Sequence, residues 1–229
     1  SMNLTDKVIS DFSSGSFLSG EFTATAGDLD TTQVHSFNSE DLFFTSYVTL
    51  VNNAGGNLEN VQFMRSFDPD NTVYEGGDYT TLNTVNSTYA ENGYSMVTAI
   101  SISSDTFTDA FGDSSIFYFS DDSRSEVYAG GFTNNYIPDF SSLDQEMGFE
   151  VEEDGAIGII FSLGQIASGG SVSFEYVTSL ASVAEVAGVL SQLGVGGSIE
   201  AITDTRTLEN GADEAGDGSS VNFVSETAE

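Results

Sequence analysis

The balance of charge constrains this chain more than any other feature of its sequence. Thirty-six aspartate and glutamate side chains face only four lysine and arginine side chains, which leaves a formal net charge of -32 over 229 residues. Such a chain stays unfolded unless its apolar residues bury enough surface to overcome the repulsion. Because 39% of the residues are hydrophobic and 12% are aromatic, we expect a folded domain with a substantial core.

The excess of carboxylates also limits which classes of ligand the chain can bind. Hard divalent cations with oxygen ligands relieve such repulsion, and calcium outside the cell fits this role best. A halophilic acidic surface is the alternative, and the two can coexist. Nucleic acid is excluded as a partner because the chain has no basic stripe to replace counterions, and an anionic membrane surface is disfavoured on the same ground. The absence of cysteine excludes disulfides and thiolate-bound zinc.

The pattern of apolar residues is that of short strands. Runs rich in β-branched and aromatic residues alternate with glycine, aspartate and asparagine, which predicts an all-β fold, an antiparallel β-sandwich. The strands are expected at 42–51, 58–67, 96–102, 115–119, 126–129, 156–163 and 172–180. One short helix is expected near the C-terminal end, where helical spacing relates Val183, Val186, Val189, Leu190 and Leu193, with Gly194 at its end.

The domain organisation follows from the same pattern. We expect residues 1–208 to form one calcium-stabilised sandwich with long acidic loops, monomeric as an isolated domain. Residues 209–229 are acidic and glycine-rich, which predicts a linker or an added edge strand. No apolar run has the length of a transmembrane helix, so no membrane insertion is expected. We expect the sequence to be a segment of a larger protein.

The first candidate site is the loop RSFDPDNTVYEGGDY. Asp68 and Asp70 flank a proline, Asn71 adds an amide oxygen, and Asp78 returns after two glycines. Calcium takes six to eight oxygen ligands, which a bent loop of this composition can supply, although the EF-hand spacing is absent. The alternative is a turn in which the Asp-Pro-Asp side chains cap their own backbone.

The second candidate site is the stretch SDDSRSEVYAGGFTNN. Asp121 and Asp122 suit a metal ion, and the neighbouring Arg124 could bind a ligand carboxylate or a sugar hydroxyl. The alternative is that Arg124 simply pairs with one of these carboxylates. The glycine pair leaves backbone open to close approach. The residues expected to contact a ligand are Asn71, Ser123, Arg124, Gly130, Gly131, Phe132 and Asn134.

Two further acidic stretches and the single histidine complete the candidates. Residues 139–154 are dense in carboxylates, of which Asp154 is assigned to metal binding, with a merely solvated acidic face as the alternative; Asp28 and Asp30 form a weaker pair. His35 is the only histidine, and no catalytic fingerprint accompanies it. We therefore expect a structural role for His35 and no enzymatic activity.

Three stretches together carry a family resemblance. They are YVTLVNNAGGNLENVQFMRSFDPDNTVYEGGDYTTLNTV, DSRSEVYAGGFTN and DGAIGIIFSLGQIASGGSVSFEYVTSL. In combination they resemble the peptide-binding domain of giant bacterial RTX adhesins, over roughly residues 12–180. Asp68, Asp70 and Asp78 match the acidic loop of that family, whereas Asp121, Asp122, Arg124 and the turn Gly130-Gly131-Phe132 match its ligand-side segment.

The resemblance implies a secreted, calcium-dependent adhesion module at the bacterial cell surface, within a larger adhesin that contributes to attachment and biofilms. Several calcium ions are implied, one of which helps to hold the free C-terminal carboxylate of a peptide or protein on a host, algal or bacterial surface. Two alternatives stay open: a calcium-dependent lectin module of the same kind of adhesin, and a passive spacer that calcium only rigidifies.

Overall fold

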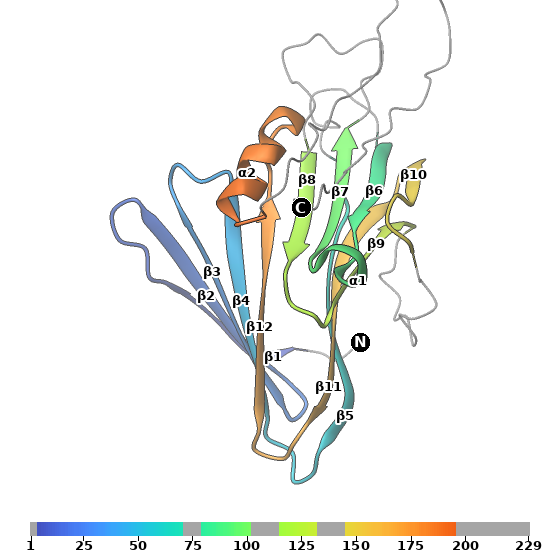
Figure 1. Cartoon of the computed structure of the whole chain (residues 1–229). Helices are drawn as coiled ribbons and strands as arrows, with labels where there is room; N and C mark the ends of the chain where they lie inside the picture. Colours follow the sequence, from blue (N-terminus) through green and yellow to red (C-terminus); the bar gives the residue numbers. More distant parts are fainter. Residues whose placement is uncertain (1–3, 71–78, 102–114, 132–144, 196–229) are drawn as a thin grey trace, which may run out of the picture.

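The computed structural model describes residues 4–70, 79–101, 115–131 and 145–195. These residues form an open, antiparallel β-sandwich with little helix (Figure 1), as predicted. The strands are β1 (Thr5–Asp11), β2 (Phe17–Ala26), β3 (Leu29–Asn38), β4 (Phe43–Asn52), β5 (Leu58–Phe67), β6 (Thr81–Ser87), β7 (Ser95–Ser101), β8 (Ser115–Ser120), β9 (Ser125–Gly130), β10 (Glu150–Glu153), β11 (Ala156–Ile166) and β12 (Ser171–Ser179).

The strands form two sheets of unequal size. The large sheet has the order β1-β2-β3-β4-β12-β8-β7-β6-β10, and the small sheet has the order β5-β11-β9. β4 and β5 match the strands expected at 42–51 and 58–67, but the turn between them carries the chain from one sheet to the other. Asn52 holds this turn, because its buried amide donates to the carbonyls of Gly56 and Ile166, both at 2.9 Å.

The two sheets are joined by an aromatic cluster. Phe63 of β5 lies 5.0 Å from Phe174 of β12, and Phe161 of β11 lies 4.3 Å from the same ring, measured between ring centroids. Tyr118 and Tyr176 extend the cluster, with rings 6.0 Å apart in an edge-to-face arrangement. Each fully buried side chain of this size contributes about 1.5–3 kcal/mol through apolar burial, so this cluster fixes the small sheet against the large one.

A helix covers the outer face of the large sheet. After a short 3-10 turn at Val183–Glu185, α2 (Val186–Gln192) buries Val186, Val189 and Leu190, in the same cluster as Met96, Phe117 and Val177 of the sheet. The predicted helix is therefore confirmed, and Gly194 follows it at φ +77° as its sequence position indicated. The one-turn helix α1 (Tyr89–Asn92) was not predicted.

The first three strands form a wing that the small sheet does not cover. β9 and β11 lie against β6, β7 and β8, at the other end of the large sheet, and β1, β2 and β3 splay away from this contact (Figure 1). Ile9 of β1 is accordingly 83% exposed. These strands were not predicted, because Ser, Thr, Gly and acidic residues interrupt their apolar alternation.

A glycine allows the tightest packing in the small sheet. Tyr128 of β9 is 1% exposed, and its ring lies directly over Gly158 of β11, where an added Cβ would stand 2.0 Å from a ring carbon. The Tyr128 hydroxyl is 2.7 Å from the Ser66 hydroxyl of β5. The ring thus spans all three strands of the small sheet.

Replacing this glycine should therefore strain the small sheet. We expect Gly158→Ala to lower the free energy of unfolding by about 1–3 kcal/mol, the usual cost of an overpacked core, as measured by denaturant titration. Gly188→Ala is the matched control, because position 188 is an exposed helical site with no atom within 4 Å of the new Cβ; it should raise stability by up to about 1 kcal/mol. Equal effects of both substitutions would contradict the close packing of Tyr128.

Candidate metal centre

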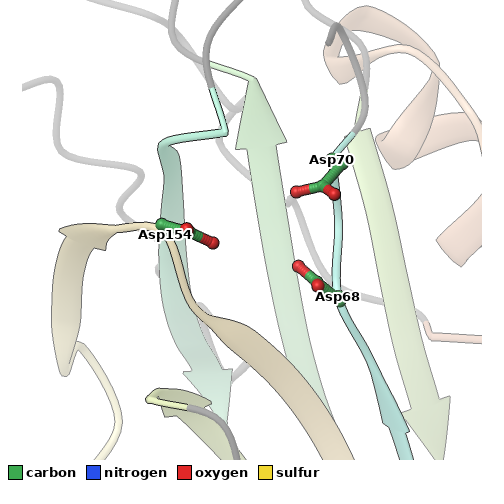
Figure 2. A group of neighbouring side chains, drawn as sticks. All are labelled: Asp68, Asp70 and Asp154. Atoms are coloured by element: carbon green, nitrogen blue, oxygen red, sulfur yellow. The ribbon is translucent and has the colours of Figure 1, made fainter. Parts of the chain in front are cut away.

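Three carboxylates converge at one end of the small sheet. Asp68, Asp70 and Asp154 each direct an oxygen to a common space, and these oxygens lie within 4.8 Å of one another. Figure 2 shows the three side chains facing this space from two separate chain segments. All three residues are exposed, so the cluster is open to solvent and to a ligand.

The pairing of β5 with β11 brings these residues together. Phe67, the last residue of β5, lies opposite Ile157 near the start of β11. Asp68 and Asp70 continue beyond β5, and Asp154 precedes β11. Side chains two positions apart in an extended chain point to the same side, so Asp68 and Asp70 share one side while Pro69 between them is buried.

The three carboxylates repel one another electrostatically. Partial burial raises the pKa of Asp68, and repulsion from Asp70 and then from Asp154 raises it further. Asp70 also contributes through a hydrogen bond between the two carboxyl groups. Like charges this close disfavour a second ionisation, so a bound cation would relieve the repulsion.

The donor set selects a class of cation. Every donor in the cluster is a carboxylate oxygen, which suits a hard cation such as calcium or magnesium and not a soft transition metal. Three carboxylates fill only part of the six to eight oxygen positions around calcium. Such an ion would therefore keep positions for backbone carbonyls, water or a ligand oxygen.

The glycine pair predicted for ligand contact lies at the same end of the small sheet. Gly130, the last residue of β9, is paired with Ala156, two residues after Asp154. Its backbone has φ +124°, a conformation that residues with a side chain rarely adopt. Gly131 is exposed beside it. The structure therefore unites the Asp68 loop, Asp154 and this glycine pair, which the sequence placed in three separate stretches.

The predicted residues Asp121 to Arg124 lie at the other end of β9. Arg124 donates to both carboxylate oxygens of Asp122, at 2.8 and 2.5 Å, and to the carbonyl of Ser173 at 2.9 Å. The hydrogen bond from Arg124 lowers the pKa of Asp122. The alternative reading, in which Arg124 pairs with a neighbouring carboxylate, is what the structure shows.

Asp121 and Ser123 are exposed in the same turn. Neither Asp121 nor Asp122 belongs to a group of three metal-suited side chains within the described residues. Ser123 and Arg124 line a depression of about 560 Å³ together with Glu91, Glu126 and Glu146. Metal binding at Asp121 and Asp122 and ligand contact at Ser123 and Arg124 stay predictions.

Other sequence candidates have structural partners or fall outside the described residues. Asp30 accepts hydrogen bonds from Thr25 at 2.7 Å and Asn53 at 2.6 Å, so its carboxylate stabilises the turns beside β3 and β4. His35 contacts the Ser46 hydroxyl through Nδ1 at 2.8 Å. Asn71, Asp78, Phe132 and Asn134 lie outside the described residues, so their predicted roles stay predictions.

Comparison with known proteins shows no family. No family model and no curated protein matches the chain. Solved structures with a similar strand arrangement include a putative aldose 1-epimerase from Klebsiella pneumoniae (12% identity, 80% of this chain, 56% of that chain, TM-score 0.41) and a family 36 α-galactosidase from Geobacillus stearothermophilus (7% identity, 80% of this chain, 28% of that chain, TM-score 0.41).

A third similar structure is a TPR-domain containing protein from Parabacteroides distasonis (10% identity, 76% of this chain, 34% of that chain, TM-score 0.41). The chain thus spans between about a quarter and just over half of the length of these proteins. Similarity at this level supports no conclusion about function. No helix within the described residues is long and apolar enough to cross a membrane.

The repulsion within the cluster predicts how the stability of the metal-free chain changes when one of the three carboxylates is neutralised. The pKa of Asp68 has its ordinary value in the unfolded chain and is raised in the folded chain. Protonated Asp68 therefore stabilises the folded state at low pH, and this contribution is lost as the pH rises through the folded-state pKa. In the presence of a chelator, we expect Asp70→Asn to raise stability at neutral pH by less than about 1 kcal/mol, because exposed charges are well screened.

The measurement is thermal unfolding in chelator between pH 3 and 7. The difference between Asp70→Asn and the unmodified chain should vanish toward pH 3, where Asp68, with its raised pKa, is protonated and no longer repels Asp70. Asp121→Asn is the matched control, since it removes an exposed charge outside the cluster. A lower stability of Asp70→Asn at neutral pH would show that Asp70 stabilises the metal-free fold and does not destabilise it through charge repulsion.

Proposed function

We propose that this chain is a calcium-dependent adhesion module of a secreted bacterial surface protein, and that Asp68, Asp70 and Asp154 hold one of its calcium ions. The observation that carries the proposal is the convergence of these three carboxylates from two chain segments far apart in the sequence. Two of them belong to the loop that resembles the adhesin family, and the third was assigned to metal binding on composition alone.

The proposed ligand is a peptide or protein with a free C-terminal carboxylate. An ion held by three protein carboxylates at an exposed position keeps coordination sites that an external carboxylate can fill. The ion would supply the local positive charge that a chain of net charge -32 lacks at this end. The exposed backbone at Gly131 lies at the same end of the sheet and permits close approach of a peptide chain.

Calcium should stabilise the fold through this cluster. A ligand that binds only the folded state at a hundred times its Kd contributes about 2.7 kcal/mol. For a domain of this size that corresponds to a rise in Tm of roughly 5–10 °C. Asp70→Asn and Asp154→Asn should each remove most of the rise, measured by scanning calorimetry with and without calcium.

Glu40→Gln is the control for the calcium response, because Glu40 is exposed and lies outside every stretch predicted to bind metal; it should retain the rise. An unchanged calcium response in both Asp70→Asn and Asp154→Asn would rule out the cluster as the stabilising site. Isothermal titration with calcium and with magnesium would then show whether any site distinguishes the two cations, because magnesium demands a tighter octahedral geometry.

Peptide capture should depend on both the ion and the free carboxylate. We expect a library of peptides with free C-termini, immobilised through their N-termini, to contain members that bind in calcium. The same peptides should lose at least about tenfold in affinity when the C-terminus is amidated, because the amide cannot replace a charged ligand of the ion. Chelator and Asp70→Asn should each have the same effect.

Equal binding of the amidated peptides would refute carboxylate capture. Two other outcomes correspond to the alternative functions. Binding to glycans that free monosaccharide competes away would indicate a lectin module. A calcium-dependent Tm with no ligand on either array would indicate a spacer.

A further inference from the structure

A depression opens between α1 and the start of β9. Its volume is about 560 Å³, within the range of ligand pockets in proteins. The lining comes from α1 and Thr88 before it, from β7 at Ser95, from the start of β9, from β11, and from Gln145 and Glu146. The residues of the Asp68 cluster are not among the described lining groups, so the depression is a separate candidate site.

Hydrogen bonds hold the walls of the depression in place. Ser95, which follows α1, donates its hydroxyl to the carbonyl of Ser125 in β9 at 3.0 Å. Further along β9, the Gln145 amide accepts the backbone N–H of Ala129 and donates to the Ala129 carbonyl, both at 2.8 Å. The chain at α1 and the segment at Gln145 are therefore both fastened to β9, and the hollow between them is a fixed part of the described fold.

The outer face of the small sheet forms the base of the depression. Ile160 of β11 is paired with Glu126 of β9. The residues beside them in sequence, Val127 and Ile159, belong to the core between the sheets, so alternation places Ile160 and Glu126 on the outer face. Ile160 is buried, whereas Glu126 is exposed and accepts a hydrogen bond from the Ser162 hydroxyl at 3.5 Å. A carboxylate thus lies next to an apolar surface.

Three glutamates give the depression its charge. Glu91 on α1, Glu126 on β9 and Glu146 all line it and are exposed. Among the described lining residues Arg124 is the one cation, and its bidentate contact with Asp122 neutralises its charge. The three glutamates come from three separate parts of the chain, so negative charge surrounds the hollow.

This arrangement attracts cations but does not suit a single metal ion. A cleft that is lined by charges of one sign and has apolar walls concentrates ions of the opposite sign. Within the described residues, only the Asp68 cluster brings three carboxylate oxygens within 4.8 Å of one another, so those of Glu91, Glu126 and Glu146 lie further apart. Calcium binds its oxygens at about 2.3–2.6 Å and cannot contact all three. A ligand that does so carries its positive charge and its hydrogen-bond donors on a larger group.

The group that fits is an organic cation on an alkyl chain. A guanidinium has five N–H donors in one plane and an ammonium has three, so either can serve several carboxylates at once. The apolar lining groups Tyr89 and Ala90 of α1 and Ile160 of β11 suit the alkyl chain that carries such a group. The Tyr89 ring also offers a face that attracts cations. Arginine and lysine side chains combine both parts.

We propose that this depression binds the guanidinium or ammonium end of an arginine or lysine side chain of another protein, with the three glutamates around the charge and the α1 residues along the alkyl chain. Free polyamines share this chemistry, and the experiment separates the two sources. The site lies at the start of β9, whereas the proposed calcium ion lies beyond its end. The inference therefore goes beyond the calcium site and does not rest on it.

Binding is measured by nuclear magnetic resonance on the isotope-labelled full chain. The probe is the peptide acetyl-GSGRGSG-amide, in chelator and at about 0.15 M salt, where charges more than about 8 Å apart are largely screened. Because the probe has no free carboxyl terminus, calcium-dependent capture cannot account for its binding. The backbone amide signals of Glu91, Glu126 and Glu146 should shift and saturate. Shifts spread over the whole acidic surface without saturation would overturn the proposal.

Two changes to the probe test the two parts of the ligand. Citrulline in place of arginine keeps the shape and removes the charge, and should weaken binding about tenfold or more. A 2-amino-3-guanidinopropionate residue keeps the guanidinium on an alkyl chain two methylenes shorter, and should weaken binding about fivefold. Equal binding of the citrulline peptide would refute recognition of a cation, and equal binding of the shortened residue would refute the apolar contact.

Variants of the protein test the same contact from the other side. Glu126→Gln and Glu146→Gln should each weaken binding of the arginine peptide about fivefold, because each removes one charged acceptor. Glu40→Gln is the matched control, since Glu40 is exposed and does not line the depression; it should leave the affinity unchanged. An equal loss in all three variants would show that the peptide is attracted to the acidic chain as a whole and not to this site.

Free cations identify the source of the group. Agmatine and spermidine are titrated under the same conditions as the peptide. Tighter binding of the peptide supports a side chain of another protein, whereas tighter binding of agmatine or spermidine at the same amides would make a free polyamine the ligand instead. Failure of every cation to bind in chelator would refute the inference while leaving calcium-dependent capture of free C-termini untouched.

Discussion

The aromatic packing between the two sheets is the interaction on which the rest of the structure depends. Phe63, Phe161, Phe174 and Tyr176 join three strands of two sheets that share no backbone hydrogen bonds. With this contact in place, β5 and β11 lie in a defined register, and the register in turn places Asp68 and Asp70 across from Asp154. The carboxylate cluster is thus a consequence of the strand pairing that core packing fixes.

The sequence predicted those strands and helices whose local pattern of apolar residues is strong. Strands with bulky alternation, such as β5 and β11, were predicted to within a few residues, and the helix around Val186 and Leu190 followed from its spacing. β2 and β3 were missed because their inward positions include Gly20, Gln33 and His35 in place of an apolar series. The assignment of β4 and β5 to different sheets is a tertiary property, set by the turn at Asn52, which no local pattern encodes.

The candidate site was likewise predictable only as far as local sequence reaches. Composition identified Asp68, Asp70 and Asp154 individually, but only the pairing of β5 with β11 shows that they meet. The sequence left open whether Arg124 binds a ligand or pairs with a neighbouring carboxylate. The structure shows the pair, because Asp122 and Arg124 are two residues apart in a tight turn. Arg65 was not singled out in the sequence, since nothing local reveals that no carboxylate of the described residues pairs with it. Arg65 and Arg124 therefore differ in their surroundings, because of these two only Arg124 pairs with a carboxylate of the described residues.

The long sequence separation across the small sheet has a consequence for folding kinetics. β5 pairs with a strand that follows it only after β6 to β10, and contacts such as that between Glu59 and Gln165, 106 positions apart, close a large loop of chain. Loop closure of this kind costs entropy before any contact repays it, which makes such pairings slow. The carboxylates at the end of the ladder meet only when that closure is complete. A partly folded chain, including one still emerging during synthesis, therefore has the acidic residues but not the cluster, and cation binding there would report that the sandwich has finished folding.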